Sequence, residues 1–119
     1  MATMSNAASR SFDQPDEQLE KGGVTIDVVH LGDMKVKRAT YPAGWKFSKD
    51  MGADRCQDTH VGYVIDGSVH VVMDDGTEFD ANAGDVVRIP ANHDAWTDDG
   101  CTLVQFDEFD SAAHRFGLS

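Results

Sequence analysis

The chain has 119 residues, 21 of them acidic against 10 basic, which gives a formal net charge of −11 at pH 7. A chain of this length predicts a single domain, and its negative charge argues against nucleic acid and anionic membrane surfaces as partners. With 2 cysteines, no apolar leader and no long apolar run, it predicts a cytoplasmic protein without a disulfide scaffold or a membrane span.

Short segments of β-strand character follow one another from residue 23 onward. Residues 1–22 are polar, so we expect them to form a largely irregular N-terminal extension. Residues 46–55 carry mixed charge and a glycine, which is typical of a loop. β-Branched residues and period-two alternation predict strands over 24–30, 34–41, 59–65, 68–73, 77–81, 85–90, 95–97 and 101–109.

Glycine and aspartate turns separate these strands. The pair Asp66-Gly67 has the residues of a two-residue hairpin turn. No long stretch has helical periodicity, and evenly spaced short strands predict an all-β sandwich or barrel over residues 23–110, followed by a C-terminal tail over 111–119.

Cys56 and His60 are the first candidates for chemistry. Side chains of a strand alternate between its two faces, so residues four apart point to the same side. His93 lies on the connection after the strand over 85–90, which a meander can bring close to them. A thiolate and two imidazoles suit zinc, and iron, manganese, nickel or copper are alternatives. Asp54 shares the face of Cys56 and could add an oxygen ligand.

Other interpretations of these residues stay open at this point. Cys56 and His60 can be packing residues of a sheet, or the cysteine can be a nucleophile with the histidine as its base. Trp45, Tyr63 and Trp96 can line an apolar pocket at a barrel mouth. They can equally belong to the core.

The stretch "GDVVRIPANHDAW" resembles the second sequence motif of the cupin superfamily, G-x5-P-x-G followed closely by a histidine. Gly84 and Pro90 occupy the first two positions, and Asn92 stands where the final glycine would be. Asn tolerates left-handed backbone angles, so the turn can survive the substitution. His93 follows directly, earlier than the histidine of the usual motif.

The stretch before Gly67 resembles the first cupin motif, G-x5-H-x-H-x3–4-E-x6-G. Counting back from Gly67, His60 takes the place of the glutamate, Cys56 that of the second histidine and Asp54 that of the first. The metal-binding positions are therefore occupied by other ligand types. This set is softer than the two histidines and one carboxylate that non-haem iron oxygenases commonly use.

Taken whole, the chain is similar to a subgroup of small single-domain cupins. The resemblance implies a small jelly-roll β-barrel with little or no helix, and through residues 10–17 it implies that the N-terminal region belongs to the structure. It names no reaction, because one fold hosts many functions.

Two functions of different classes follow from these observations. The first is a cupin with a divalent-metal site and an apolar pocket that binds or transforms a small molecule. The second is a metal-free barrel that binds or senses a small ligand without catalysis. With either function we expect a homodimer, with the edge of segment 24–30 as a natural interface.

Overall fold

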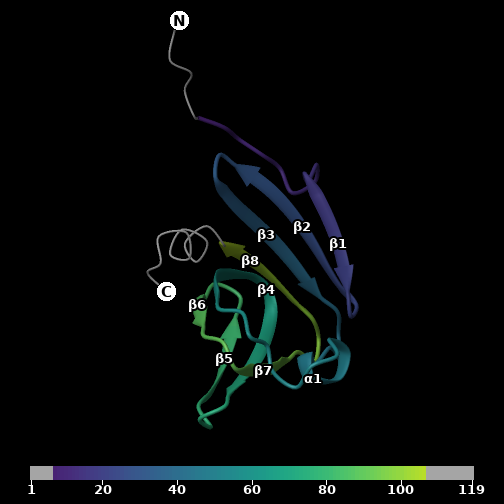
Figure 1. Cartoon of the computed structure of the whole chain (residues 1–119), viewed down its shortest axis with the longest axis vertical. Coiled ribbons are helices and arrows are strands. Elements are labelled where there is room, and N and C mark those ends of the chain that lie inside the picture. Colours follow the sequence, from purple (N-terminus) through teal and green to yellow (C-terminus); the bar gives the residue numbers. More distant parts are fainter. Residues whose placement is uncertain (1–6, 107–119) are drawn as a thin grey trace, which may run out of the picture.

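A computed structural model gives the structure of residues 7–106, in which eight strands and one helical turn form a jelly-roll barrel (Figure 1). The prediction of an all-β fold is confirmed. In chain order the elements are β1 (Glu17–Lys21), β2 (Val24–Leu31), β3 (Met34–Tyr41), α1 (Phe47–Asp50), β4 (His60–Met73), β5 (Glu78–Asn82), β6 (Val86–Ile89), β7 (His93–Trp96) and β8 (Cys101–Phe106).

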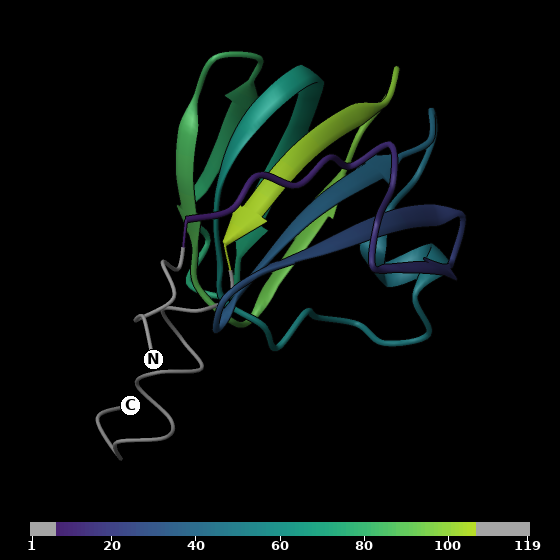
Figure 2. The same cartoon turned by 90° about the horizontal axis from the view of Figure 1, so that it is seen from above.

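Every strand pairing in the barrel is antiparallel, and β4 is the strand that joins its two parts. The strands run in the order β1-β2-β3-β8-β4-β5, while β6 and β7 also pair with β4. The first half of β4 pairs with β6 and β8, and the second half pairs with β5 and β7. Seen from above, β4 and β8 lie between β5 on one side and β2 on the other (Figure 2).

The predicted hairpin at Asp66-Gly67 is wrong, because β4 runs through this pair without turning. A bulge interrupts its pairing with β8 between Val64 and Asp66, and Gly67 has a φ of 74°. The bulge shifts the buried face by one residue, from even-numbered positions such as Val64 to odd-numbered positions such as Val69. The predicted strands over 59–65 and 68–73 are therefore one strand.

The composition of the N-terminal region predicted a largely irregular segment, but part of this region is a strand. Residues Glu17–Lys21 form β1, which pairs along its whole length with β2. The buried carboxylate of Asp27 in β2 ties this edge together, since it accepts hydrogen bonds from Gln18 (2.7 Å) and from Arg38 (2.9 Å). Because β1 and β3 flank β2, segment 24–30 is not the exposed edge that we expected.

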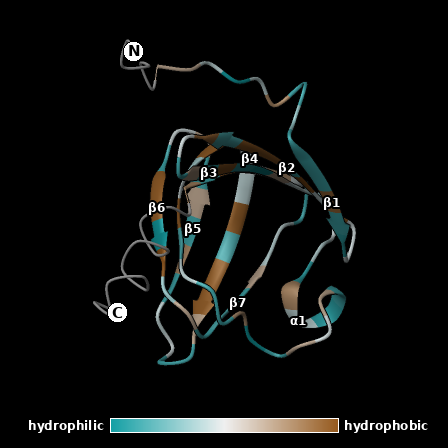
Figure 3. Cartoon of the chain, turned by 45° about the horizontal axis from the view of Figure 1, so that its top comes forward, coloured by the Kyte–Doolittle hydropathy of each residue, from teal (hydrophilic) through white to brown (hydrophobic). Residues whose placement is uncertain are grey.

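The interior of the barrel is filled mainly by small apolar side chains, among which valine is the most frequent. Hydrophobic and hydrophilic residues alternate along β4 (Figure 3), and Val64 and Val71 are completely buried. The predicted loop over 46–55 contains α1, whose Ser48 donates hydrogen bonds to the buried Asp94 of β7 (3.0 and 2.8 Å). This contact holds α1 against the β7 end of the barrel.

The last predicted strand is present as β8 up to Phe106. Residues 107–109 and the predicted tail over 111–119 lie outside the described residues. Within residues 7–106 the one helix has 4 residues, far too few for a transmembrane helix.

Candidate metal centre

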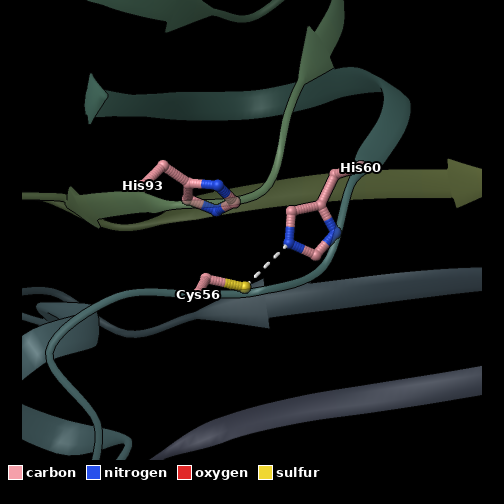
Figure 4. Close-up of side chains that lie close together, drawn as sticks. All are labelled: Cys56, His60 and His93. Carbon is pink, nitrogen blue, oxygen red and sulfur yellow. Dashed lines mark hydrogen bonds between the residues drawn. The ribbon is translucent and has the colours of Figure 1, made fainter. Parts of the chain in front are cut away.

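Cys56, His60 and His93 come together at one point of the barrel wall. One potential ligand atom from each lies within 4.8 Å of the others. The Cys56 Sγ is 3.5 Å from His60 Nε2, and the two imidazole rings are 5.3 Å apart between centroids. Figure 4 shows the three side chains pointing toward a shared space. The structure therefore brings together the three residues that the sequence singled out.

Backbone pairing explains how His93 reaches Cys56. The segment containing Cys56 forms an isolated antiparallel bridge with His93, in which Cys56 N donates to His93 O at 2.7 Å and Asn92 N donates to Cys56 O at 2.7 Å. Asn92 has a φ of 70° and turns the chain into this bridge. Asn tolerates such a left-handed angle. For this reason Asn92 was expected to stand in for the final glycine of the cupin motif.

Each histidine of the centre has a hydrogen-bond partner on its Nδ1. His93 Nδ1 is 2.6 Å from the carbonyl oxygen of Pro90, and His60 Nδ1 is 3.1 Å from Gln105 Oε1. Gln105 in turn donates from Nε2 to the Tyr41 hydroxyl at 3.1 Å. Partners of this kind fix the orientation of metal-binding imidazoles in known sites.

Burial shifts the ionisation of two of these side chains. Cys56 is 6% exposed and His93 is 3% exposed. Desolvation raises the pKa of the Cys56 thiol and lowers the pKa of the His93 imidazole, because both shifts favour the neutral form. A raised thiol pKa argues against Cys56 as an activated nucleophile, and neutral imidazole is the form of histidine that binds metals.

A cavity of about 170 Å³ opens onto the three side chains. Its wall is mainly apolar, and at its polar end it also carries Asp58 and Gln105 beside the candidate metal ligands. The lining residues are Val24, Ile26, Lys37, Tyr41, Trp45, Phe47, Met51, Cys56, Asp58, His60, Val69, Ile89, His93, Ala95, Leu103 and Gln105.

The other predicted site residues have different positions. Trp45 lines the cavity, and its buried Nε1 has no hydrogen-bond partner among the described residues. Tyr63 is 42% exposed and Trp96 packs against the His70 ring, and neither lines this cavity. Asp54 is exposed and lies outside the cluster of three.

Sequence reasoning overlooked Tyr41 and Gln105. Both face the cavity, from β3 and β8. Gln105 is a buried polar residue, 6% exposed, in a strand that otherwise buries Cys101 and Leu103 on the same face. The sequence signal for Gln105 was the period-two alternation that places it on the same face of β8 as the two apolar residues.

The distance between the Cys56 sulfur and His60 Nε2 suits two ligands of one tetrahedral metal. Zinc binds thiolate sulfur at about 2.3 Å and imidazole nitrogen at about 2.0 Å, and tetrahedral angles then separate two such ligands by about 3.5 Å. The distance between Cys56 Sγ and His60 Nε2 is 3.5 Å. Three protein ligands leave one coordination position for a water or a bound molecule, as in catalytic rather than structural zinc sites.

The similarity to known proteins lies in the structure. No protein-family model matches the sequence, and no curated protein matches it. Ectoine synthase from P. lautus is 9% identical with a TM-score of 0.68, covering 84% of this chain and 76% of that chain. An RmlC-like cupin from Shewanella frigidimarina is 20% identical with a TM-score of 0.58, covering 79% and 83%. KdgF from Halomonas sp. is 17% identical with a TM-score of 0.57, covering 76% and 83%. The chain has the cupin fold.

Proposed function

We propose that this protein binds a divalent metal through Cys56, His60 and His93 and uses the open side of that metal to bind or transform a small molecule. The observation that carries the proposal is the convergence of the three ligand atoms, within 4.8 Å of one another, at the wall of a cavity. A packing role alone does not require a thiol and an imidazole of one segment to point at the same space as an imidazole from a distant segment.

Zinc is our first choice among the metals. Thiolate ligands favour zinc, whereas manganese prefers carboxylate and water oxygens. Iron and nickel accept imidazole and stay as comparators in the experiment below. The described cluster contains no carboxylate, which distinguishes it from the histidine and carboxylate sets of non-haem iron oxygenases.

The cavity supports a small, largely apolar ligand with polar groups at one end. A bound metal would act as a Lewis acid toward a carbonyl or carboxylate oxygen of that ligand. Phe47 and Met51 supply apolar contacts on the wall. The buried Trp45 Nε1 has no partner among the described residues, and a hydrogen-bond acceptor on the ligand would satisfy it. Asp58 is the one carboxylate among the described residues that line the cavity, and it is our candidate for a general base.

Metal analysis of tag-free protein by plasma mass spectrometry tests this function. We expect about one zinc per chain in the wild type and its loss in His60→Ala and His93→Ala. His30→Ala is the matched control, because His30 is exposed and bonds to Glu17 away from the centre. Zinc should also raise the melting temperature of the wild type and not that of the two site variants.

The opposite outcome is equally informative. If the wild type contains no metal and takes up none after incubation with zinc, iron, manganese and nickel, the metal function is wrong. The three side chains would then be packing residues of a metal-free barrel that binds or senses a small ligand, the second function considered for this chain.

A further inference from the structure

We propose that Gln105 is a positioning residue of the metal centre, which holds His60 as the tautomer with hydrogen on Nδ1 and thereby keeps the Nε2 lone pair directed at the Cys56 sulfur. This inference rests on the proposed function, because the His60 tautomer matters only if His60 binds a metal. The hydrogen bonds that carry it exist without metal, so it can be tested separately.

Gln105 lies between the metal centre and Tyr41. Its side chain is on β8, is 6% exposed, and contacts His60 Nδ1 with Oε1 at 3.1 Å and the Tyr41 hydroxyl with Nε2 at 3.1 Å. An amide has one acceptor end and one donor end. The end of the amide that contacts Tyr41 and the end that contacts His60 are therefore of opposite kind.

The direction of the hydrogen bonds from Gln105 determines which ring nitrogen of His60 carries the hydrogen. With the Gln105 Nε2 hydrogen donated to Tyr41, the Oε1 faces His60 and requires a hydrogen on Nδ1. A neutral imidazole carries only one ring hydrogen, so in neutral His60 this arrangement leaves Nε2 as an unprotonated acceptor. That nitrogen is 3.5 Å from Cys56 Sγ, on the side where a metal would bind.

The reverse direction of the amide would prevent His60 from binding a metal through Nε2. If the amide were turned over, its NH₂ group would face Nδ1 and the ring hydrogen would move to Nε2, where it would point at Cys56. A protonated Nε2 has no lone pair for a metal. The Tyr41 hydroxyl can accept as well as donate, so the observed contacts, Nε2 with Tyr41 and Oε1 with His60, give the direction of the amide.

His93 supplies an internal reference for this argument. Its Nδ1 is 2.6 Å from the carbonyl oxygen of Pro90, and a carbonyl only accepts. The hydrogen of neutral His93 is therefore on Nδ1, and its Nε2 is unprotonated. Gln105 does for His60, through a side chain, what the backbone does for His93, so both rings present the same nitrogen to the shared space.

The tautomers can be read directly by nuclear magnetic resonance. The sample is metal-free full-length protein labelled with ¹⁵N at histidine, and long-range ¹H–¹⁵N correlation spectra are assigned by comparison with His60→Ala and His93→Ala. We expect the hydrogen of both His60 and His93 on Nδ1. A His60 spectrum with the hydrogen on Nε2 overturns the proposal.

Variants of Gln105 test its effect on metal affinity. Gln105→Leu removes the acceptor, and we expect mixed His60 tautomers and zinc affinity lowered about 10- to 100-fold in competition with a chromophoric chelator. Gln105→Glu still accepts from Nδ1, so it should retain the tautomer and most of the affinity. Val104→Ala is the matched control, because this neighbour in β8 faces away from the cavity.

The outcomes separate this inference from the metal function. Zinc bound equally well by Gln105→Leu and the wild type, with an unchanged His60 tautomer, refutes the positioning role and leaves the metal centre standing. A wild type that binds no metal refutes the metal function, while the spectra still decide whether Gln105 controls the His60 tautomer. A loss of affinity shared by Gln105→Leu and Val104→Ala would mean a general effect on β8 and would also refute the proposal.

Discussion

Burial has opposite consequences for metal binding at two side chains of the candidate centre. The pKa shifts of Cys56 and His93 both come first from desolvation. For His93 the shift favours the form that binds metal, whereas Cys56 must lose its proton on binding. Metal affinity should therefore fall as the pH falls, through the thiol rather than through His93.

Another histidine, His70, has the opposite surroundings on the outer side of β4. Its Nδ1 is 2.6 Å from Asp80 and its Nε2 is 2.9 Å from Glu78. The hydrogen bond to Asp80 is the main cause that raises the pKa of His70, with a smaller effect of Glu78. Both ring nitrogens donate in the charged form, which the two carboxylates stabilise.

This arrangement predicts a pH-dependent contribution to stability. Because folding raises the pKa of His70, its contribution is fully present below the ordinary histidine pKa of about 6.5 and disappears as the pH rises through the folded value. His70→Gln should therefore lower the free energy of unfolding by about 1 kcal/mol or less at acidic pH, and the difference should shrink at alkaline pH. Urea unfolding of both proteins at several pH values measures it, and a difference independent of pH would contradict the explanation.

At the scale of elements, the bulge in β4 is the feature that places the site. Up to Val64 the even-numbered residues face inward, which puts His60 on the cavity wall. Beyond Gly67 the odd-numbered residues face inward and build the second half of the barrel around Val69 and Val71. A regular strand could not supply a buried face to both halves, because its alternation would continue unchanged.

Gly67 should therefore be far less tolerant of substitution than another glycine with the same kind of backbone angle. A Cβ at Gly67 (φ 74°) would lie 2.1 Å from the carbonyl oxygen of Gly100, whereas a Cβ at Gly76 (φ 90°) would meet nothing within 4 Å. Gly76→Ala should cost about 1–2 kcal/mol of unfolding free energy, from its left-handed backbone alone. Gly67→Ala should cost clearly more, as measured by chemical unfolding. Equal costs would mean that β8 yields to the new side chain.

At the scale of the whole molecule, one outer face carries exposed apolar side chains. Tyr63 on β4 and Val86 on β6 stand opposite each other in register and are 42% and 77% exposed, and Ile65 is 45% exposed. Neighbouring apolar side chains on a surface are typical of interaction sites. They give the expected homodimer a more suitable face than segment 24–30, which is covered by β1.

We therefore expect a dimer in sedimentation velocity experiments, and a monomer for Val86→Lys, because a charge buried in an apolar contact is costly. Thr77→Lys, which adds the same charge in an exposed turn between β4 and β5, is the control and should stay dimeric. A wild type that sediments as a monomer over the accessible concentration range would refute the dimer.

The residue pattern alone was enough for the all-β class, most strand positions and the shared face of Cys56 and His60, because strand formation and period-two alternation are local properties. It could not distinguish a hairpin from a bulge at Gly67, since both require a glycine with a left-handed backbone angle. Pairing with β8 and β5 decided for the bulge.

The complete centre also depended on contacts between distant segments. His93 meets Cys56 through a backbone bridge, and Gln105 meets His60 across a separation of 45 residues. The alternation of β4 places Tyr63 and His60 on opposite faces of the strand. Only the closed barrel showed that the face of His60 is the inner one. Local sequence determines which side chains share a face, whereas the order and register of strands in the barrel determine which faces meet.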